Sequence, residues 1–188
     1  DLEAGIDANG DVVAWASEFH IGVNHLAVNK PLDYPLLAAL ELGLSKPEHY
    51  TGFLFRNATA PYAFPNIRVK TWHHGEYIFR SSHLRSPGRL ENVFANESFV
   101  DELAALVTAD PAEFRLKHLS DPRGLAVLRA AMDLAGWQKR PSPNPDAAGG
   151  GSVAKGRGIA YARYNDTNTY VAAVAEVEVD RGSGEIRV

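Results

Sequence analysis

The stretch that decides the fold reads Leu84-Arg-Ser-Pro-Gly-Arg-Leu-Glu-Asn-Val-Phe-Ala-Asn-Glu-Ser-Phe-Val-Asp-Glu-Leu-Ala104. A Ser-Pro-Gly turn with Arg85 at its mouth leads into an amphipathic pattern, which predicts a helix from about Arg89 to Thr108. Spacings of three and four residues place on one face of this helix the side chains of Leu90, Val93, Phe94, Glu97, Val100 and Ala104. Turns before helix N-termini hold anions and polar cofactors, because backbone N–H groups there lack partners. The stretch therefore indicates a core helix that follows a candidate binding turn.

Two further helices are predicted immediately downstream. Asp110-Pro-Ala-Glu113 combines an N-cap aspartate with proline at the first helical position, and opens a helix to about Leu119. Asp121-Pro122 opens another, which ends near Ala135 with Gly136 as its C-cap.

Strand-like runs flank this helical cluster on both sides. Asp7 to Asp11 is a hairpin turn signal. Upstream runs bounded by turn residues predict strands at Val12–Ile21, Gly52–Asn57 and Ile67–Trp72, and a short helix at Tyr34–Leu44. Downstream, alternating apolar residues predict strands at Ile159–Tyr164, Tyr170–Val179 and Glu185–Val188. The predicted fold class is α+β, with strand groups on either side of a helical cluster.

The prolines and glycines suggest a division of the chain. Pro141, Pro143, Pro145 and Gly149-Gly-Gly-Ser152 are typical of a linker. We expect an α+β portion at 1–140, a linker at 141–156 and an incomplete β-rich segment at 157–188. Both ends lie in strand-like sequence rather than in polar tails, so we expect a piece of a longer protein.

The composition excludes several classes of function. The net charge of -4 over 188 residues gives no basic footprint for nucleic acid. No apolar run approaches the roughly 20 residues that span a membrane. Because the chain has no cysteine, it cannot itself supply a disulfide, a zinc–thiolate site or the ligands of an iron–sulfur cluster.

A series of short motifs, taken in order, resembles a known family. They are Pro61–Arg68, Leu84–Gly88, Glu97–Ala104, Asp110–Leu116, Gly136-Trp137, Lys155–Ala160 and Glu176–Val179. From about residue 50 onward the chain resembles the molybdopterin-binding large subunit of the xanthine dehydrogenase and aldehyde oxidase family. It looks closest to the bacterial isoquinoline 1-oxidoreductase and nicotinate dehydrogenase type. The resemblance implies that the chain is part of the molybdopterin-binding domain.

The resemblance implies an oxidoreductase that uses a molybdenum cofactor. The family hydroxylates N-heteroaromatic rings or aldehydes with oxygen from water, and electrons leave through iron–sulfur clusters. The expected partners are therefore the rest of the large subunit, an iron–sulfur electron-transfer subunit and a small-molecule substrate. Nucleic acid and a membrane span are not expected. Relatives occur in the cytoplasm and in the cell envelope, so the compartment stays open, although the cytoplasm is favoured.

The resemblance also suggests cofactor-binding residues. Arg85 occupies the position of a family arginine that lies at the cofactor, and Ser86 and Gly88 accompany it as residues that form the turn. Pro87 replaces the aromatic side chain that sandwiches substrates in xanthine-type members, which argues against a purine substrate. The family's Gly-Gln-Gly and Gly-x-Gly-Glu motifs are absent, so we assign no catalytic residue. We expect the chain alone to be inactive and to bind no cofactor.

Glu97 has two interpretations. A carboxylate on an apolar stripe can be a catalytic base, or it can be a buried structural group paired with a cation or the backbone. The structural interpretation is favoured, because the family's base lies elsewhere. We expect Glu97 to be buried and hydrogen-bonded to the loop before the helix, where it would fix the Arg85 turn.

Two other groups of residues resemble metal sites. In both, the pattern of ligands argues against metal binding. His73, His74 and His83 lack an acidic or thiolate ligand at fixed spacing. The run from Asn165 to Asn168 lacks the glycine and the terminal glutamate of a calcium loop.

Two functions compete with an enzyme fragment. The chain is either a non-catalytic binding or scaffold domain that uses its helical face, or a cofactor-free accessory subunit. A longer reading frame that contains the missing motifs would favour the enzyme fragment. A start codon immediately before Asp1 and a stop codon after Val188 would reject it.

Overall fold

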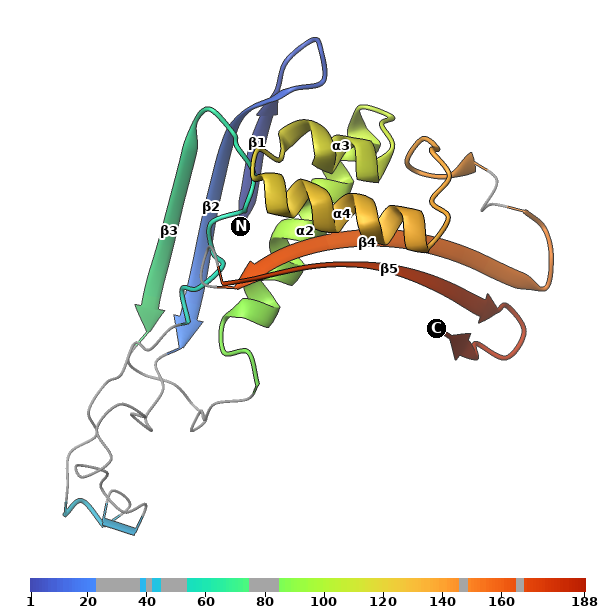
Figure 1. The fold of residues 1–188 in the computed structure, drawn as a ribbon. Helices are drawn as coiled ribbons and strands as arrows, with labels where there is room; N and C mark the ends of the chain where they lie inside the picture. The colour runs from blue at the N-terminus through green and yellow to red at the C-terminus, as the bar shows by residue number, and fades with distance from the viewer. Residues whose placement is uncertain (23–37, 40–41, 45–53, 75–84, 146–148, 165–167) are drawn as a thin grey trace.

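The computed structural model describes residues 1–22, 38–39, 42–44, 54–74, 85–145, 149–164 and 168–188. In chain order its elements are β1 (Leu2–Ile6), β2 (Val12–Gly22), β3 (Ile67–His74), α2 (Arg89–Leu106), α3 (Pro111–His118), α4 (Pro122–Leu134), β4 (Val153–Tyr164), β5 (Thr169–Asp180) and β6 (Ile186–Arg187). Figure 1 shows the helices lying between a sheet of the first three strands and a long hairpin of β4 and β5. This arrangement confirms the predicted α+β class, with strand groups on either side of a helical cluster.

The first sheet has the order β1-β2-β3 and mixes two kinds of pairing. β1 and β2 form the predicted hairpin, in which the Asp7 carboxylate accepts hydrogen bonds from the backbone N–H groups of Asn9 and Asp11. β3 then pairs with β2 in parallel, with Trp15 opposite Ile67. The two parallel strands end together at Gly22 and His74, so both point towards the same edge of the molecule (Figure 1).

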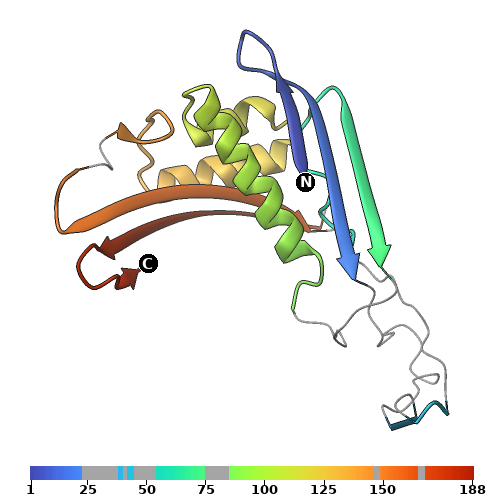
Figure 2. The same ribbon diagram turned by 180° about the vertical axis from the view of Figure 1, so that it is seen from behind.

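The second sheet is antiparallel, in the order β4-β5-β6. β4 and β5 pair along their whole length, from Val153 opposite Asp180 to Tyr164 opposite Thr169. Seen from behind, α2 crosses between this hairpin and the first sheet (Figure 2). The helix therefore packs between the two sheets and contributes to the core that they share.

One continuous core joins the sheets and the helices. Trp15 of β2 stacks on Phe64 at 5.1 Å between ring centroids and meets the edge of Phe99 of α2 at 5.2 Å. The buried apolar members come from both sheets, from all three described helices and from the loop before β3: Val12, Trp15, Ala60, Tyr62, Phe64, Val100, Leu103, Ala104, Ala112, Phe114, Leu119, Leu128, Ile159 and Tyr161. Burial of this much apolar surface is the main source of stability.

The helix boundaries follow the caps read from the sequence. The Asp110 carboxylate accepts from the N–H groups of Ala112 and Glu113 at 2.9 Å each, as expected for an N-cap. Asp121 caps α4 in the same way, through the N–H of Arg123. Gly136 has φ 57° after the last turn of α4, which is the left-handed conformation of a helix C-terminus.

Three expectations need correction. Leu90 and Phe94 are 66% and 73% exposed, so the predicted stripe of α2 enters the core only in its second half. The described part of the predicted strand Gly52–Asn57 forms turns, because its carbonyls meet side chains rather than another strand. β4 begins at Val153, six residues before the strand expected at Ile159–Tyr164. The helix expected at Tyr34–Leu44 lies largely outside the described residues, and the division into 1–140, 141–156 and 157–188 stays a prediction.

Candidate functional site

The turn from Arg85 to Gly88 stands at the N-terminus of α2. The side chains of Arg85 and Ser86 are exposed, and Ser86 has a left-handed backbone with φ 62°. Its carbonyl accepts from the N–H groups of Arg89 and Leu90, at 3.0 and 3.2 Å, so the turn folds tightly onto the first turn of the helix. The structure thus brings a cation and a hydroxyl together at a helix N-terminus, where the helix dipole also favours negative charge.

Gly88 is required by the packing of this turn. It is buried, and it is the N-cap residue of α2 with φ 72° and no side-chain cap. A Cβ at this position would lie 2.1 Å from the carbonyl oxygen of Leu54, which is far inside contact distance. The glycine therefore serves close backbone packing and a left-handed φ at once. This explains the turn glycine without reference to a ligand.

Glu97 is buried, as expected, with 6% of its surface exposed. Its Oε1 accepts from the Tyr62 hydroxyl at 2.7 Å, and its Oε2 accepts from Arg115 Nε at 2.9 Å and from the Tyr161 backbone N–H at 2.8 Å. We expected Glu97 to bond to the loop before α2, and for the described residues of that turn this expectation is wrong. The three donors come instead from the loop before β3, from α3 and from β4. Glu97 therefore ties these elements together instead of fixing the Arg85 turn directly.

Arg115 completes a buried ion-pair network. No part of its side chain is exposed, and it donates to Asp101 at 2.6 Å, to the Pro111 carbonyl at 3.0 Å and to the Glu97 carbonyl at 3.1 Å. Burial opposes its charge, but the negative charge of Glu97, with that of Asp101, raises the pKa of the guanidinium. Burial, with the Glu97 charge, raises the pKa of Tyr62 well above its ordinary value.

This network supports the structural interpretation of Glu97. Its carboxylate accepts three hydrogen bonds from protein donors and Glu97 is only 6% exposed, whereas a general base must reach the proton that it removes. The sequence did not reveal Arg115 as the partner, because a separation of 18 residues across two helices carries no periodic signal.

An open groove begins beside the turn. It has a volume of about 470 Å³ and runs between the first half of α2 and strands β4 and β5. Its lining is mostly apolar and includes Ser86, Arg89, Leu90, Phe94, Tyr164 and Val171. The guanidinium of Arg89 lies over the Tyr164 ring at 4.4 Å from its centroid. The exposed part of the predicted apolar stripe therefore faces this groove.

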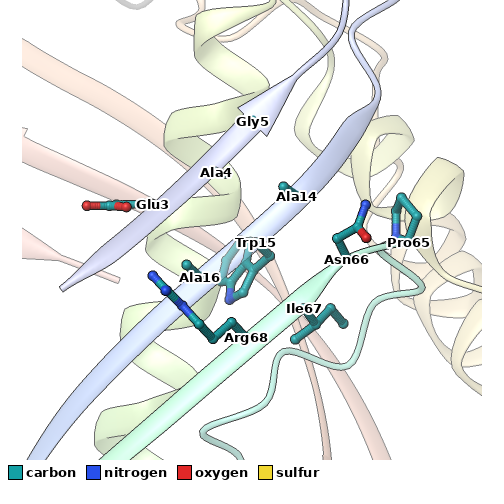
Figure 3. A pocket seen from close by; sticks show the side chains of 10 residues that line it. All are labelled: Glu3, Ala4, Gly5, Ala14, Trp15, Ala16, Pro65, Asn66, Ile67 and Arg68. Carbon is teal, nitrogen blue, oxygen red and sulfur yellow. The ribbon is translucent and has the colours of Figure 1, made fainter.

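A second hollow lies on the outer face of the first sheet, away from this turn. Figure 3 shows it over β1, β2 and the start of β3, with Ala16 of β2 next to Arg68 of β3. None of its lining residues belongs to the turn or to the Glu97 network. We therefore take the Arg85 turn, and not this hollow, as the candidate site.

The described residues offer neither a metal-ligand cluster nor a membrane helix. Within the described ranges, no three or more histidine, aspartate or glutamate side chains are placed to hold a metal ion. His83, one of the three histidines considered above, lies outside those ranges, as do 165–167. None of the helices in the described part of the chain is long and apolar enough to cross a bilayer.

Comparison with known proteins confirms the resemblance read from the motifs. Residues 42–119 match the molybdopterin cofactor-binding domain. The whole chain is 35% identical to one of the subunits of nicotinate dehydrogenase from Pseudomonas putida over 198 aligned positions, and it covers 16% of that protein. Over 107 positions, 56% of the chain is 38% identical to the beta subunit of isoquinoline 1-oxidoreductase from Brevundimonas diminuta, and this match covers 12% of that protein. The chain thus spans only a small part of the length of these relatives.

Proposed function

We propose that this chain, which is similar to the molybdopterin cofactor-binding domain over residues 42–119, forms one wall of the cofactor site in a molybdenum-dependent oxidoreductase. The observation that carries the proposal is the family match over 42–119, which contains the Arg85–Gly88 turn and Glu97. In this proposal the oxidoreductase activity belongs to a longer protein that contains this chain. The two relatives are examples of such longer proteins.

The residues of the turn fit a polar, negatively charged group. Arg85 supplies an exposed cation, Ser86 supplies an exposed hydroxyl, and α2 points its N-terminus at the same place. Gly88 keeps the role of shaping the turn. When bound, a molybdenum cofactor would supply the hydroxylation chemistry and accept the substrate's electrons. The residues of this chain would bind and orient it, and none of them is proposed as the base.

Within this function, we favour N-heteroaromatic substrates. Nicotinate and isoquinoline, which appear in the names of the two relatives, are both aromatic rings that contain nitrogen. Aldehydes stay as the alternative substrate class. From the resemblance, an iron–sulfur subunit and the rest of the large subunit are the proposed partners. This chain has no cysteine, so the cluster would be held by another part of the complex. We propose that the chain alone is inactive.

The decisive experiment is elemental analysis for molybdenum on the full-length protein, purified with its neighbouring subunits. We expect stoichiometric molybdenum and oxidation of nicotinate or isoquinoline by the complex. The 188-residue chain alone should have neither. An intact, active complex without molybdenum would reject the proposal. An intact complex with neither molybdenum nor redox activity would favour the scaffold alternative.

The turn is tested by charge reversal. Arg85→Glu in the full-length protein should lower the molybdenum content, because a carboxylate would repel a negatively charged cofactor. The matched control is Arg129→Glu, which reverses an exposed arginine on α4. Equal molybdenum content in both variants and in the parent protein would remove Arg85 from the site.

A further inference from the structure

Two buried asparagines on α2 hold a segment that has no regular structure. Asn92 and Asn96 are 4% and 1% exposed and lie one helical turn apart. A buried amide is costly unless it is hydrogen-bonded. The segment that these amides contact, Leu54–Ala58, is called the strap below.

Each amide nitrogen uses both of its hydrogens on the strap. Asn92 Nδ2 donates to the carbonyls of Leu54 and Arg56, at 2.9 Å each. Asn96 Nδ2 donates to the carbonyls at 57 and 58, at 2.9 and 3.3 Å. The two side chains thus replace the hydrogen-bonding partners that a neighbouring strand would have given this backbone.

The strap is also anchored on its other side. Asn57 donates from its side chain to the Arg163 carbonyl of β4 at 2.8 Å. Its backbone has φ 61°, a left-handed conformation that asparagine tolerates better than most residues. The strap is therefore tied to α2 through Asn92 and Asn96 and to β4 through its own side chain.

The strap lies directly against the candidate turn. The Leu54 carbonyl that accepts from Asn92 is also the group that Gly88 approaches so closely that no Cβ fits. Gly88 lies between Ser86 and the first residues of α2, whose N–H groups donate to the Ser86 carbonyl. A displacement of Leu54 would therefore be transmitted to the turn through hard backbone contact.

We propose that Asn92 and Asn96 are positioning residues, which act through the strap to fix the Arg85–Gly88 turn in the geometry that meets the cofactor. This inference rests on the function proposed above. Asn92 has the larger part, because its partner Leu54 touches Gly88. The amide group is essential, because an apolar residue of similar size offers no donor to the strap carbonyls.

Hydrogen–deuterium exchange in the full-length protein tests the coupling without reference to activity. Asn92→Leu keeps side-chain volume and removes both donors, so it should raise exchange in peptides that cover the strap and also in those that cover 85–90, where the Arg89 and Leu90 amides donate to Ser86. The matched control is Asn66→Leu, which removes an exposed amide bond to the Val13 carbonyl and should leave both peptides unchanged. Faster exchange in the strap with an unchanged turn would overturn the proposal.

A milder variant guards against loss of folding. Asn57→Gly accepts the same left-handed backbone and removes only the bond to the Arg163 carbonyl. It should raise exchange in the strap and the turn in the same sense as Asn92→Leu, but by less. If Asn92→Leu does not fold and Asn57→Gly loosens only the strap, the proposal is wrong.

The cofactor readout separates the two proposals. In the purified complex, Asn92→Leu should lower turnover per bound molybdenum by at least about tenfold and change the Mo(V) electron paramagnetic resonance spectrum, since small misplacements of this kind cost large factors in rate. Unchanged turnover per molybdenum and an unchanged spectrum would overturn the positioning role. Absence of molybdenum from the parent complex would instead defeat the proposed function, while the exchange experiment would still decide whether the strap controls the turn.

Discussion

The two halves of α2 are built on different principles. The first half buries Asn92 and Asn96 against backbone carbonyls and leaves Leu90 and Phe94 exposed. The second half buries apolar side chains, including Leu103 and Ala104, in the shared core. Glu97 lies at the junction of the two halves. One regular helix thus has a polar, directional contact surface at the end near the candidate turn and a non-directional apolar one at the other end.

The difference shows that one half of α2 mainly stabilises the fold and the other half mainly positions a neighbouring segment. Apolar packing contributes most of the free energy of folding, but it is not directional and tolerates small shifts. Hydrogen bonds from a buried amide contribute less free energy, but they fix the partner's position within narrow limits. The candidate turn is attached to the half of α2 that controls position.

The largest effect is expected at the junction. Glu97→Leu would leave Arg115 buried without its main partner, and removal of one member of a buried ion pair typically costs about 3–5 kcal/mol. Urea denaturation of the 188-residue chain measures this loss. The control is Glu102→Leu on the exposed face of the same helix, which should change the free energy of unfolding by no more than about 0.5 kcal/mol. If both variants changed the free energy of unfolding by the same amount, the ion-pair network would contribute nothing to stability.

A matched pair of substitutions compares the two halves directly. Leu103 is 4% exposed and Leu90 is 66% exposed. Leu103→Ala should lower the free energy of unfolding by about 2–5 kcal/mol, because it leaves a cavity in the core. Leu90→Ala should change it by no more than about 0.5 kcal/mol. The same denaturation measurement checks both values, and a large loss at Leu90 would show that the groove side belongs to the core.

Asp110, the N-cap of α3, holds elements that pack beside the second half of α2. Besides capping, the Asp110 carboxylate accepts from the Arg140 N–H at 2.9 Å and from Trp137 Nε1 at 3.1 Å. Asp110→Ala should cost about 1–3 kcal/mol, since it removes a cap and leaves a partly buried donor without its partner. Asp110→Asn keeps a cap oxygen and should cost less. Thermal unfolding of the two variants should rank them in that order.

The smallest effect is a dependence of stability on pH. His118 Nε2 accepts from the Val12 N–H at 3.1 Å, so its Nδ1 donates to the Phe114 carbonyl at 2.8 Å and the ring is neutral. Burial lowers the pKa of His118, and neighbouring Lys117 lowers it further, while the Phe114 carbonyl and Asp11 act in the opposite direction.

The sign of the dependence follows from this lowered pKa. The unfolded chain takes up the proton first, so the contribution of His118 is complete above about pH 6.5 and is lost as the pH falls below it. One proton limits the loss to about 1.4 kcal/mol for each pH unit. Unfolding measured between pH 5 and pH 8 should show a shallower dependence for His118→Asn than for the parent chain. An identical dependence in both would exclude His118 as the source.

Local chemistry explains most of what the sequence predicted correctly. The caps at Asp110 and Asp121 and the hairpin turn at Asp7 depend on residues within a few positions of one another, and all three appear as expected. The predicted stripe of α2 was wrong in its first half because periodicity reveals a face but not what covers it. Asn92 and Asn96 were missed for the same reason, since an amide on a helix has no local sign of burial.

The sequence by itself determined the helices with their caps, the hairpins and the similarity to the molybdopterin cofactor-binding domain, because these depend on short-range spacing and on ordered motifs. Only the tertiary structure decided which chain segments meet. It paired Glu97 with Arg115, placed β3 parallel to β2 and set the strap between Asn92 and the Gly88 turn. The physical reason is that these contacts join residues far apart along the chain, and which of them form depends on how the whole core packs.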